Sequence, residues 1–528
     1  MRLQTQAGDR IWFLMIAIVI LALGSMPFWA GKSAETEEKI FRGIFFDETD
    51  YAVHISMMQA GRLGEWAYQM RFTSEEHSPA FIRIFYLALG HVSRWLNLEV
   101  EPTFRFARWI FGAGALFSIY QLCFAVFSNR GLARAAFFIS VFGSGLGWLQ
   151  LMLKVPMKPI SPIDFWLIDA YVWFSISLFP SFSFTLALMC TATYLYLTFL
   201  SQGEWKAVFA VGLLAVISQM TNPIAFATVN LALIGATLFE SWKARSIHWK
   251  QFFALGFVGV VQIPLLVYNY LILQHDPVWR QFTIQNQTLS PPPSFYLYGF
   301  APLWVFAAYG MLTAFGNRKT SMISMSAWVA GGFILAYLPV LIQRRFLLGI
   351  TIPLGILSIY GINSFIESLT NKWKSIKKRE GLLYFAYVSA ASISAIYLLF
   401  GLSLHLRTHP VNKFYSRDLE NALIWLDQNA GANEFALGTV TTGQLVAQRT
   451  GLKTYIGHEM ETLHYYKKQA VMQDYYRGVT SADWILQTPI EWVIYGPYEK
   501  DIAPLFSPDH ELSLVYENST VAIYKVKK

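Results

Sequence analysis

The chain has 528 residues, of which 55% are hydrophobic and only 14% are charged, and its mean hydropathy is +0.38. An ordinary soluble domain carries about 25% charged residues, so this composition excludes that class and, with its repeated long apolar runs, predicts a polytopic membrane protein. The net charge of +8 does not indicate a nucleic-acid partner, because the cations lie mostly in short loops between apolar runs, as the positive-inside rule expects.

The first apolar run, residues 11–30, follows Arg2 and Arg10 and predicts a retained membrane anchor with its N-terminus in the cytoplasm. Basic or mixed-charge loops follow, and we place them all on the cytoplasmic side. They are residues 128–134, 201–206, 241–250, 316–320 and 371–380. The spans that fit between these loops, ending with one at 382–404, predict about eleven transmembrane helices and a C-terminus on the outer face of the cell membrane.

Segment 80–96 is the exception in this predicted topology, because both of its ends lie on the outer side of the membrane. It carries Arg83, His91 and Arg94, so we predict a helix that lies in the membrane interface. In the alternative, the segment crosses the membrane and everything before it must be threaded again.

The pattern changes at about residue 410. RDLENALIWLDQN places Leu419, Leu423 and Leu426 on one face of a helix, EFALGT, KTYIGH and EWVIYGP are typical of short strands, and ELSLVYENSTVAIYKVK is typical of a hairpin. The sequence therefore predicts a polytopic all-α membrane domain over 1–409, with an outer loop at 31–80, and an extracytoplasmic α/β domain over 410–528. The second domain has no Gly-rich phosphate loop, so we expect it to have a structural role or to handle an acceptor.

The outer loop contains a tight acidic cluster, in which Asp47, Glu48 and Asp50 follow an apolar run. A carboxylate at the membrane surface can act as a general base that takes a proton from an attacking hydroxyl. A second carboxylate can orient the acceptor or hold a divalent cation such as Mg²⁺ or Mn²⁺. On a helix, Asp47, Asp50 and His54 share one face, whereas Glu48 points about 100° away from them.

Helix capping is the alternative interpretation of the same residues. Asp47 would be the N-cap of a helix that runs to Gln59, with Glu48 and Asp50 in its first turn, where the orphan N–H groups and the helix dipole favour negative charge. The two interpretations are compatible, since a helix N-terminus near the membrane is also a good place for an anion.

FDETDY (46–51) resembles the acidic motif in the first outer loop of membrane glycosyltransferases of the GT-C fold, especially the protein O-mannosyltransferase type. HSPAFIRIFYLALG (77–90) stands where that type carries a His-Pro-Pro-led helix, with Ser78 in place of the first proline. The remaining layout resembles uncharacterised bacterial membrane proteins grouped with these transferases. The resemblance implies a polyprenyl-phosphate-linked sugar as donor, a hydroxyl acceptor on the outer face, and Asp47 as catalytic base with Glu48 beside it.

A polyprenyl phosphate donor needs cations at the outer headgroup level. Arg344 and Arg345 lie between two apolar spans on the side that should be poor in cations, and a guanidinium suits a phosphate. His77 and Arg83, which follow the acidic cluster, are further candidates, as is Arg71. In the alternative, the two adjacent arginines pair with loop carboxylates or contact ordinary headgroups.

Asp164 and Asp169 are the remaining outer carboxylates with aromatic neighbours, Trp166 and Trp173. Aromatic residues at this level are usually interface anchors, and they can also stack on a sugar. We therefore predict an accessory role for the two aspartates.

Two other function classes compete with a transferase. Transporters and flippases usually place ionisable groups deep within their spans, whereas 106–127, 182–200 and 321–341 are nearly free of them. A non-catalytic sensor or assembly protein would use the acidic cluster only for capping. Replacing Asp47 distinguishes these classes, because only a transferase would lose its activity.

Overall fold

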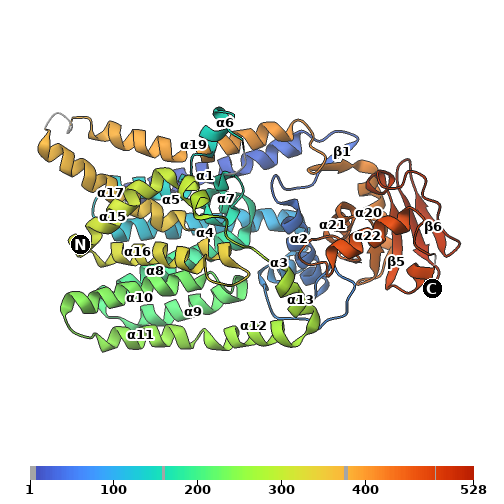
Figure 1. Cartoon of the computed structure of the whole chain (residues 1–528), viewed down its shortest axis with the longest axis horizontal. Coiled ribbons are helices and arrows are strands. Elements are labelled where there is room, and N and C mark those ends of the chain that lie inside the picture. Colours follow the sequence, from blue (N-terminus) through green and yellow to red (C-terminus); the bar gives the residue numbers. More distant parts are fainter. Residues whose placement is uncertain (1–6, 157–160, 374–377, 482) are drawn as a thin grey trace. The chain divides into compact units, whose positions relative to one another are not determined.

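The computed structural model describes residues 7–156, 161–373, 378–481 and 483–528 (Figure 1). Arg2 and residues 374–377 of the last basic loop lie outside these ranges. Contacts divide the chain into two compact units: the first comprises 1–26, 107–268 and 288–401, and the second comprises 27–106, 269–287 and 402–528. The predicted boundary at residue 410 stays a prediction, and the contacts group residues 27–106 with the C-terminal segment.

The first unit consists mainly of apolar helices, because long runs of apolar residues satisfy their backbone groups internally only as helices. Its main helices are α1 (Ala7–Ser33), α4 (Val100–Val126), α5 (Arg130–Phe142), α8 (Pro180–Gln202), α9 (Trp205–Thr221), α10 (Phe226–Ala244), α11 (Trp249–Val260), α12 (Ile263–His275), α15 (Ala301–Gly316), α16 (Thr320–Leu335), α17 (Thr351–Lys372) and α19 (Glu380–Leu406). Of these, α1, α4, α12 and α19 continue into the second unit.

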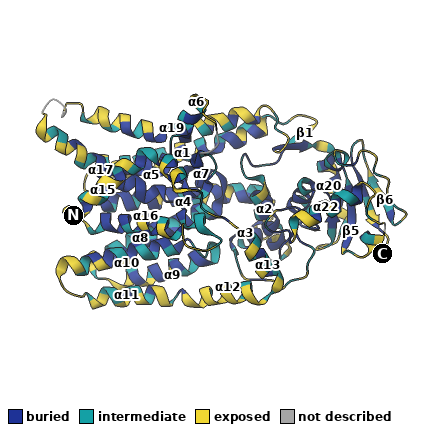
Figure 2. Ribbon diagram, in the orientation of Figure 1, coloured by how far each residue is buried: buried dark blue, intermediate teal, exposed yellow. Residues whose placement is uncertain are grey.

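Large apolar side chains remain exposed on the outer helices (Figure 2), including Phe253 at 66% and Leu404 at 65%. Inside the unit, α15 and α17 approach closely at two glycines. A Cβ on Gly310 would lie 2.2 Å from the carbonyl oxygen of Leu357, and one on Gly361 would lie 1.9 Å from that of Phe306. Lipid-facing apolar surfaces and small residues at helix crossings are both typical of membrane proteins.

Among the described residues, six helical segments are long and apolar enough to cross a membrane. They are α1, α4, α8, the segment Trp249–His275, α17 and α19, and α14 (Pro293–Gly299) with α15, bent by 94°, makes a seventh if the pair is one span. The chain is therefore a multi-pass membrane protein. The shorter apolar helices α9 and α16 add candidates, and the number of about eleven stays a prediction.

Segment 80–96 forms α3 (Phe85–Trp95), which has 11 residues. At 1.5 Å per residue this helix is roughly 16 Å long, about half of the bilayer core. α3 is not among the helices that are long and apolar enough to cross a membrane. This favours the interface helix, and the position of segment 80–96 relative to the membrane stays a prediction.

The second unit contains α2 (Glu48–Leu63), α3, α13 (Pro277–Gln285) and a small α/β layer. A two-stranded ladder pairs β1 (Lys39–Phe41) with β2 (Phe414–Ser416) in antiparallel orientation. A five-stranded sheet has the order β4-β3-β5-β7-β6. Its strands are β3 (Phe435–Leu437), β4 (Lys453–Thr454), β5 (Ile490–Tyr495), β6 (Leu512–Glu517) and β7 (Ala522–Val526).

This sheet is parallel from β4 through β3 to β5 and antiparallel from β5 through β7 to β6. The predicted terminal hairpin is confirmed by the pairing of β6 with β7. Around the sheet lie α20 (Arg417–Asn429), α21 (Val440–Thr450) and α22 (Tyr465–Tyr476). The predicted apolar face of α20 is confirmed, because Leu419, Leu423 and Leu426 are fully buried in one hydrophobic cluster.

The sidedness of the second unit is a testable prediction of the basic-loop pattern. We expect single cysteines introduced near residues 35 and 500 to be labelled from the same, non-cytoplasmic side by a membrane-impermeant reagent. Cys123 and Cys190 are buried, so their background should be low in the intact protein. Labelling of the two positions from opposite sides of the membrane would contradict the predicted topology.

Candidate functional site

The acidic cluster forms the N-terminus of α2, and the predicted capping geometry is confirmed. Asp47 is the N-cap, and its Oδ1 accepts hydrogen bonds from the backbone N–H of Asp50 at 3.4 Å and from the Thr49 hydroxyl at 3.2 Å. Its backbone is left-handed, with φ 55° and ψ 58°. Aspartate adopts this conformation more readily than most non-glycine residues, and eight other non-glycine residues of the described ranges share a positive φ.

Glu48 faces a buried cation of the C-terminal segment. It forms an ion pair with Lys413, whose side chain is 9% exposed, and accepts a hydrogen bond from Asn412 Nδ2 at 2.8 Å. Burial opposes the charge of Glu48, but the Lys413 ammonium outweighs it and holds the pKa of Glu48 below its usual value. Glu48 is therefore an ionised, paired carboxylate whose two oxygens are both engaged.

Asp50 contacts the imidazole of His458, with 3.2 Å between Oδ1 and Nε2. His458 is 7% exposed, and its Nδ1 accepts hydrogen bonds from the backbone N–H groups of Met460 at 3.1 Å and Glu461 at 3.2 Å. Since two donors point at Nδ1, the ring proton of the neutral imidazole lies on Nε2 and is donated to Asp50. His458, a residue of the C-terminal segment, thus fixes the position of the Asp50 side chain.

Asp47 is left as the carboxylate without a cation in direct contact among the described residues. It is half-buried. Burial, with repulsion from the nearby charge of Asp50, raises its pKa to about 7. A carboxylate with this pKa exchanges a proton readily at neutral pH, which is what a general base requires.

Other residues predicted near the cluster have structural contacts. His54 stacks on Tyr86 of α3, with 4.1 Å between ring centroids. Arg71 is fully buried and forms a salt bridge with Glu65 at 2.5 Å. These contacts hold α2, α3 and the loop after α2 together.

The two candidate phosphate ligands of this loop are also engaged. His77 donates from Nδ1 to the carbonyl of Glu75 at 2.8 Å and accepts at Nε2 from the backbone N–H of Met70 at 2.9 Å, so both ring nitrogens are used. Arg83 forms an ion pair with Glu461 at 3.5 Å, and its side chain is 32% exposed. Its role as a phosphate ligand stays a prediction.

In the first unit, Arg344 and Arg345 lie in the short helix η3 (Gln343–Leu347) and are half-buried. The guanidinium of Arg344 lies over the ring of Trp166, 5.3 Å from its centroid. Burial raises the pKa of Asp169, and the charges of Arg344 and Arg345 act in the opposite direction. The structure therefore brings both arginines near the predicted accessory residue Asp169.

Asp164 is 2% exposed, and its Oδ2 accepts hydrogen bonds from the backbone N–H groups of Gly145 at 3.2 Å and Gly147 at 3.1 Å. A Cβ on Gly147 would lie 2.6 Å from Asp164 Oδ1, so a side chain there would collide with the carboxylate. Asp164 thus fixes the turn that begins α6 (Gly147–Met152), and an accessory role in chemistry stays a prediction.

Sequence reasoning missed His458 and Lys413, the two residues that hold the acidic cluster. His458 lies in the loop after β4, four residues beyond Thr454, and Lys413 directly precedes β2. Binding and catalytic residues concentrate in loops, whereas the pattern KTYIGH predicted a strand that ends at His458. Nothing in the local sequence of Lys413 indicates its partner.

The donor set for a divalent cation is small. Within the described ranges, no group of three or more His, Cys, Asp or Glu side chains could hold one ion. Asp47 and Asp50 alone give at most two carboxylates, and Asp50 already accepts from His458. Mg²⁺ is commonly held by one or two carboxylates together with substrate phosphates, so a cation at Asp47 and Asp50 stays a prediction, and no step below passes through a metal.

No family model matches the sequence, and no curated protein matches it. Solved structures do match. ArnT from Cupriavidus metallidurans, bound to undecaprenyl phosphate, has a TM-score of 0.54 at 12% identity over 99% of this chain and 98% of that chain. The apo oligosaccharyltransferase of Archaeoglobus fulgidus has a TM-score of 0.52 at 11% identity over 93% and 70%. The arabinofuranosyltransferase AftD from Mycobacteria has a TM-score of 0.55 at 12% identity over 100% of this chain and 40% of that chain.

These three structures are GT-C glycosyltransferases, and this chain has the same fold. The predicted resemblance is thus confirmed at the level of the GT-C fold. Because the matching proteins are different kinds of transferase, the fold does not single out the O-mannosyltransferase type.

Proposed function

We propose that this GT-C chain transfers a sugar from a polyprenyl-phosphate-linked donor to a hydroxyl acceptor on the outer face of the membrane. Two matching structures support the donor class, since ArnT from Cupriavidus metallidurans was solved with undecaprenyl phosphate and the Archaeoglobus fulgidus oligosaccharyltransferase with a dolichol-phosphate. The observation that carries the proposal is Asp47, a half-buried carboxylate with a pKa of about 7 at the N-cap of α2 and without a cation in direct contact among the described residues.

In the proposed reaction, Asp47 accepts the proton of the acceptor hydroxyl as that oxygen forms a bond to the anomeric carbon of the sugar. The bond between this carbon and the phosphate oxygen breaks, and polyprenyl phosphate leaves with the bonding electrons. Asp50, fixed by His458, keeps a negative charge near Asp47 that favours proton uptake. Glu48 and Lys413 anchor the helix end rather than react.

Arg344 and Arg345 are the proposed ligands of the donor phosphate. A fixed guanidinium stabilises the negative charge that develops on the leaving phosphate. The positive charges of both arginines act on Asp169, which is therefore near them. His77 and Arg83 are weaker candidates for this role, because the first uses both ring nitrogens and the second is paired with Glu461.

The direct test is a transfer assay with the purified protein in nanodiscs. A panel of polyprenyl-phosphate-linked sugars is supplied with a membrane extract as acceptor source, and released polyprenyl phosphate is measured. We expect release with at least one donor for the wild type and background release for Asp47→Asn. Movement of a lipid or solute across the membrane without release from any donor would instead indicate a transporter or flippase.

The pKa of Asp47 predicts the pH dependence of this reaction. A base must be deprotonated to act, so kcat/KM should rise with pH and level off above a midpoint of about 7. The midpoint should rise in His458→Gln, because the nearby imidazole, when protonated, lowers the pKa of Asp47. A flat profile between pH 5.5 and 8.5 (roughly the range set by a single group titrating near 7) would contradict the role of Asp47.

A further inference from the structure

A polar cavity of about 330 Å³ lies in the second unit, and Asp47 and the rest of the acidic cluster do not line it. Its walls come from the end of α1, from β1, from the first turns of α4, from α20 and from the end of α21. Its cations are Lys32, Arg105, Arg417 and Arg449, and its carboxylates are Glu35, Glu101 and Glu420. The lining thus holds one more cation than carboxylate.

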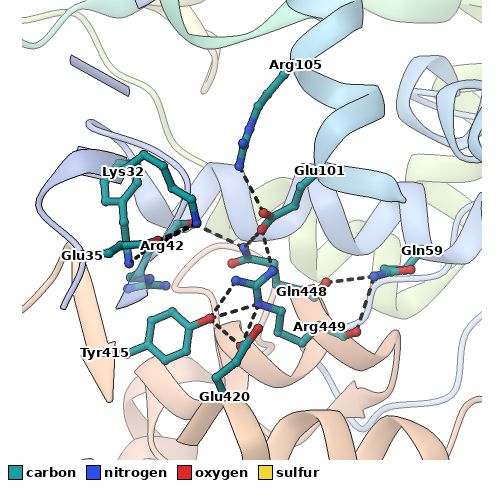
Figure 3. Close-up of polar contacts among 11 residues, drawn as sticks. Lys32, Glu35, Arg42, Gln59, Glu101, Arg105, Tyr415, Glu420, Gln448 and Arg449 are labelled. Atoms are coloured by element: carbon teal, nitrogen blue, oxygen red, sulfur yellow. Dashed lines mark hydrogen bonds and ion pairs between the residues drawn. The ribbon is translucent and has the colours of Figure 1, made fainter. Parts of the chain in front are cut away.

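The three carboxylates are already paired (Figure 3). Glu101 accepts hydrogen bonds from Arg449 at 2.8 Å and from Arg105 at 3.2 Å. Glu420 lies 3.2 Å from Arg449 Nε and accepts from the Tyr415 hydroxyl at 2.6 Å. Arg449 is therefore paired with two carboxylates. It stabilises the wall of the cavity and does not bind the ligand.

Arg417 and Arg105 keep unused donors. Arg417 donates from Nε to the carbonyl of Glu37 at 2.6 Å and from Nη2 to that of Thr36 at 3.0 Å, and it has no ion pair with a carboxylate within the described ranges. Arg105 reaches Glu101 with Nη2, and its guanidinium lies over the ring of Phe28, 4.0 Å from the centroid. Its Nε is buried, so only the Nη groups can reach a ligand. Two guanidinium groups with free N–H groups beside a polar cavity form a site for a phosphate.

The cavity lies where two membrane spans end. Lys32 is in the last turn of α1, and Glu101 and Arg105 are in the first two turns of α4, and both helices are long and apolar enough to cross the membrane. Trp29 on α1 is 58% exposed. A tryptophan at the end of a span is typical of the headgroup level of the bilayer.

We propose that this cavity binds the phosphate-bearing headgroup of a membrane phospholipid. Arg417 and Arg105 donate to the phosphate oxygens, and Lys32, which forms an ion pair with Glu35, lines the same cavity. The acyl chains of the lipid leave the cavity beside the exposed Trp29 of α1. This site is separate from the proposed sugar transfer, and its lipid fastens the ends of two spans to β1, α20 and α21.

The test uses the full-length protein in detergent and measures the rise in melting temperature caused by each additive, together with lipid retention by native mass spectrometry. The additives are phosphatidylglycerol, diacylglycerol with the same acyl chains, and inorganic phosphate. We expect phosphatidylglycerol to raise the melting temperature of the wild type and to be retained, because a ligand that binds the folded state stabilises it. Diacylglycerol, which lacks the phosphate, should not.

Arg417→Gln and Arg105→Gln should each weaken phosphatidylglycerol binding by about tenfold or more, as expected for a lost charge-assisted hydrogen bond. Arg477→Gln, which changes an exposed arginine of the same unit that does not line the cavity, is the matched control. Arg417→Lys keeps the charge and should lose part of the phosphatidylglycerol binding, because an ammonium group cannot donate the two parallel hydrogen bonds of a planar guanidinium.

Arg417 also donates to two backbone carbonyls, so its loss can lower the melting temperature without any lipid. The decisive quantity is therefore the lipid-dependent rise, which a purely structural role leaves unchanged. Equal rises in the wild type, Arg417→Gln and Arg105→Gln would overturn the proposal, and Arg105→Gln decides it if Arg417→Gln does not fold. An equal rise with inorganic phosphate alone would overturn the lipid assignment and indicate a free-phosphate site.

Discussion

Asp47→Asn should lower sugar-transfer turnover by at least about 100-fold, the lower end of the loss expected for a general base. The amide keeps the shape of the carboxylate and can still cap α2 from its side-chain oxygen, so the helix N-terminus should survive. The measurement is the initial rate of polyprenyl phosphate release in nanodiscs at pH 8, where the wild-type carboxylate is mostly ionised. Transfer that stays near normal in this variant would leave capping as the whole role of Asp47.

Asp47→Asn should lower the activity of the protein without lowering its melting temperature. The pKa of Asp47 is raised in the folded protein, so its charge costs stability as the pH rises from about 4, the unfolded value, through about 7. Asp47→Asn removes that cost, and its melting temperature at pH 8 should equal or exceed that of the wild type. A large fall would show that the lost activity reflects misfolding.

Glu48→Gln is the matched control for this experiment. The pKa of Glu48 is lowered by Lys413, so its ion pair contributes stability above about pH 4 that is lost as the pH falls. At pH 8 the variant leaves the Lys413 ammonium buried without its carboxylate, and the melting temperature should fall. Turnover per folded molecule should fall less than in Asp47→Asn. Equal losses of turnover would assign the base to both carboxylates.

Arg344→Ala and Arg345→Ala should each weaken the use of the donor by roughly tenfold or more. A charge-assisted hydrogen bond to phosphate contributes roughly 1.5–3 kcal/mol, and 1.4 kcal/mol corresponds to a factor of about ten. Arg344→Lys and Arg345→Lys keep the charge and lose the planar fork, so a several-fold effect is expected. The measurement is a titration of the polyprenyl-phosphate-linked sugar at fixed acceptor, followed by the reverse titration.

Acceptor dependence should barely change in these four variants, which separates donor binding from a general loss of activity. Asp169→Asn is a useful companion, because it removes the negative charge that lies near both arginines without removing their own charge. Unchanged donor dependence in all four arginine variants would show that these residues serve packing against Trp166 or contacts with ordinary headgroups. The donor phosphate would then be sought near Arg83.

Structural features that depend only on residues close together in the chain could be predicted from the sequence. The apolar runs predicted helices such as α1 and α19, since span length and composition are local properties. The spacing of Leu419, Leu423 and Leu426 predicted the buried face of α20, because a helix repeats every 3.6 residues. Capping of α2 by Asp47 was predicted for the same reason, since the cap and its donor at Asp50 are three residues apart.

The chemistry of the acidic cluster was decided only by the tertiary structure. Asp50 and His458 are 408 positions apart, and Glu48 and Lys413 are 365 apart. No periodic pattern connects residues at such separations, so the sequence could not assign which carboxylate is neutralised by a cation and which is not. Burial and the charge of Asp50 then raise the pKa of Asp47, and both are properties of the folded chain. The sequence by itself determined which residues begin α2, whereas packing against the C-terminal segment determined which of them can act as a base.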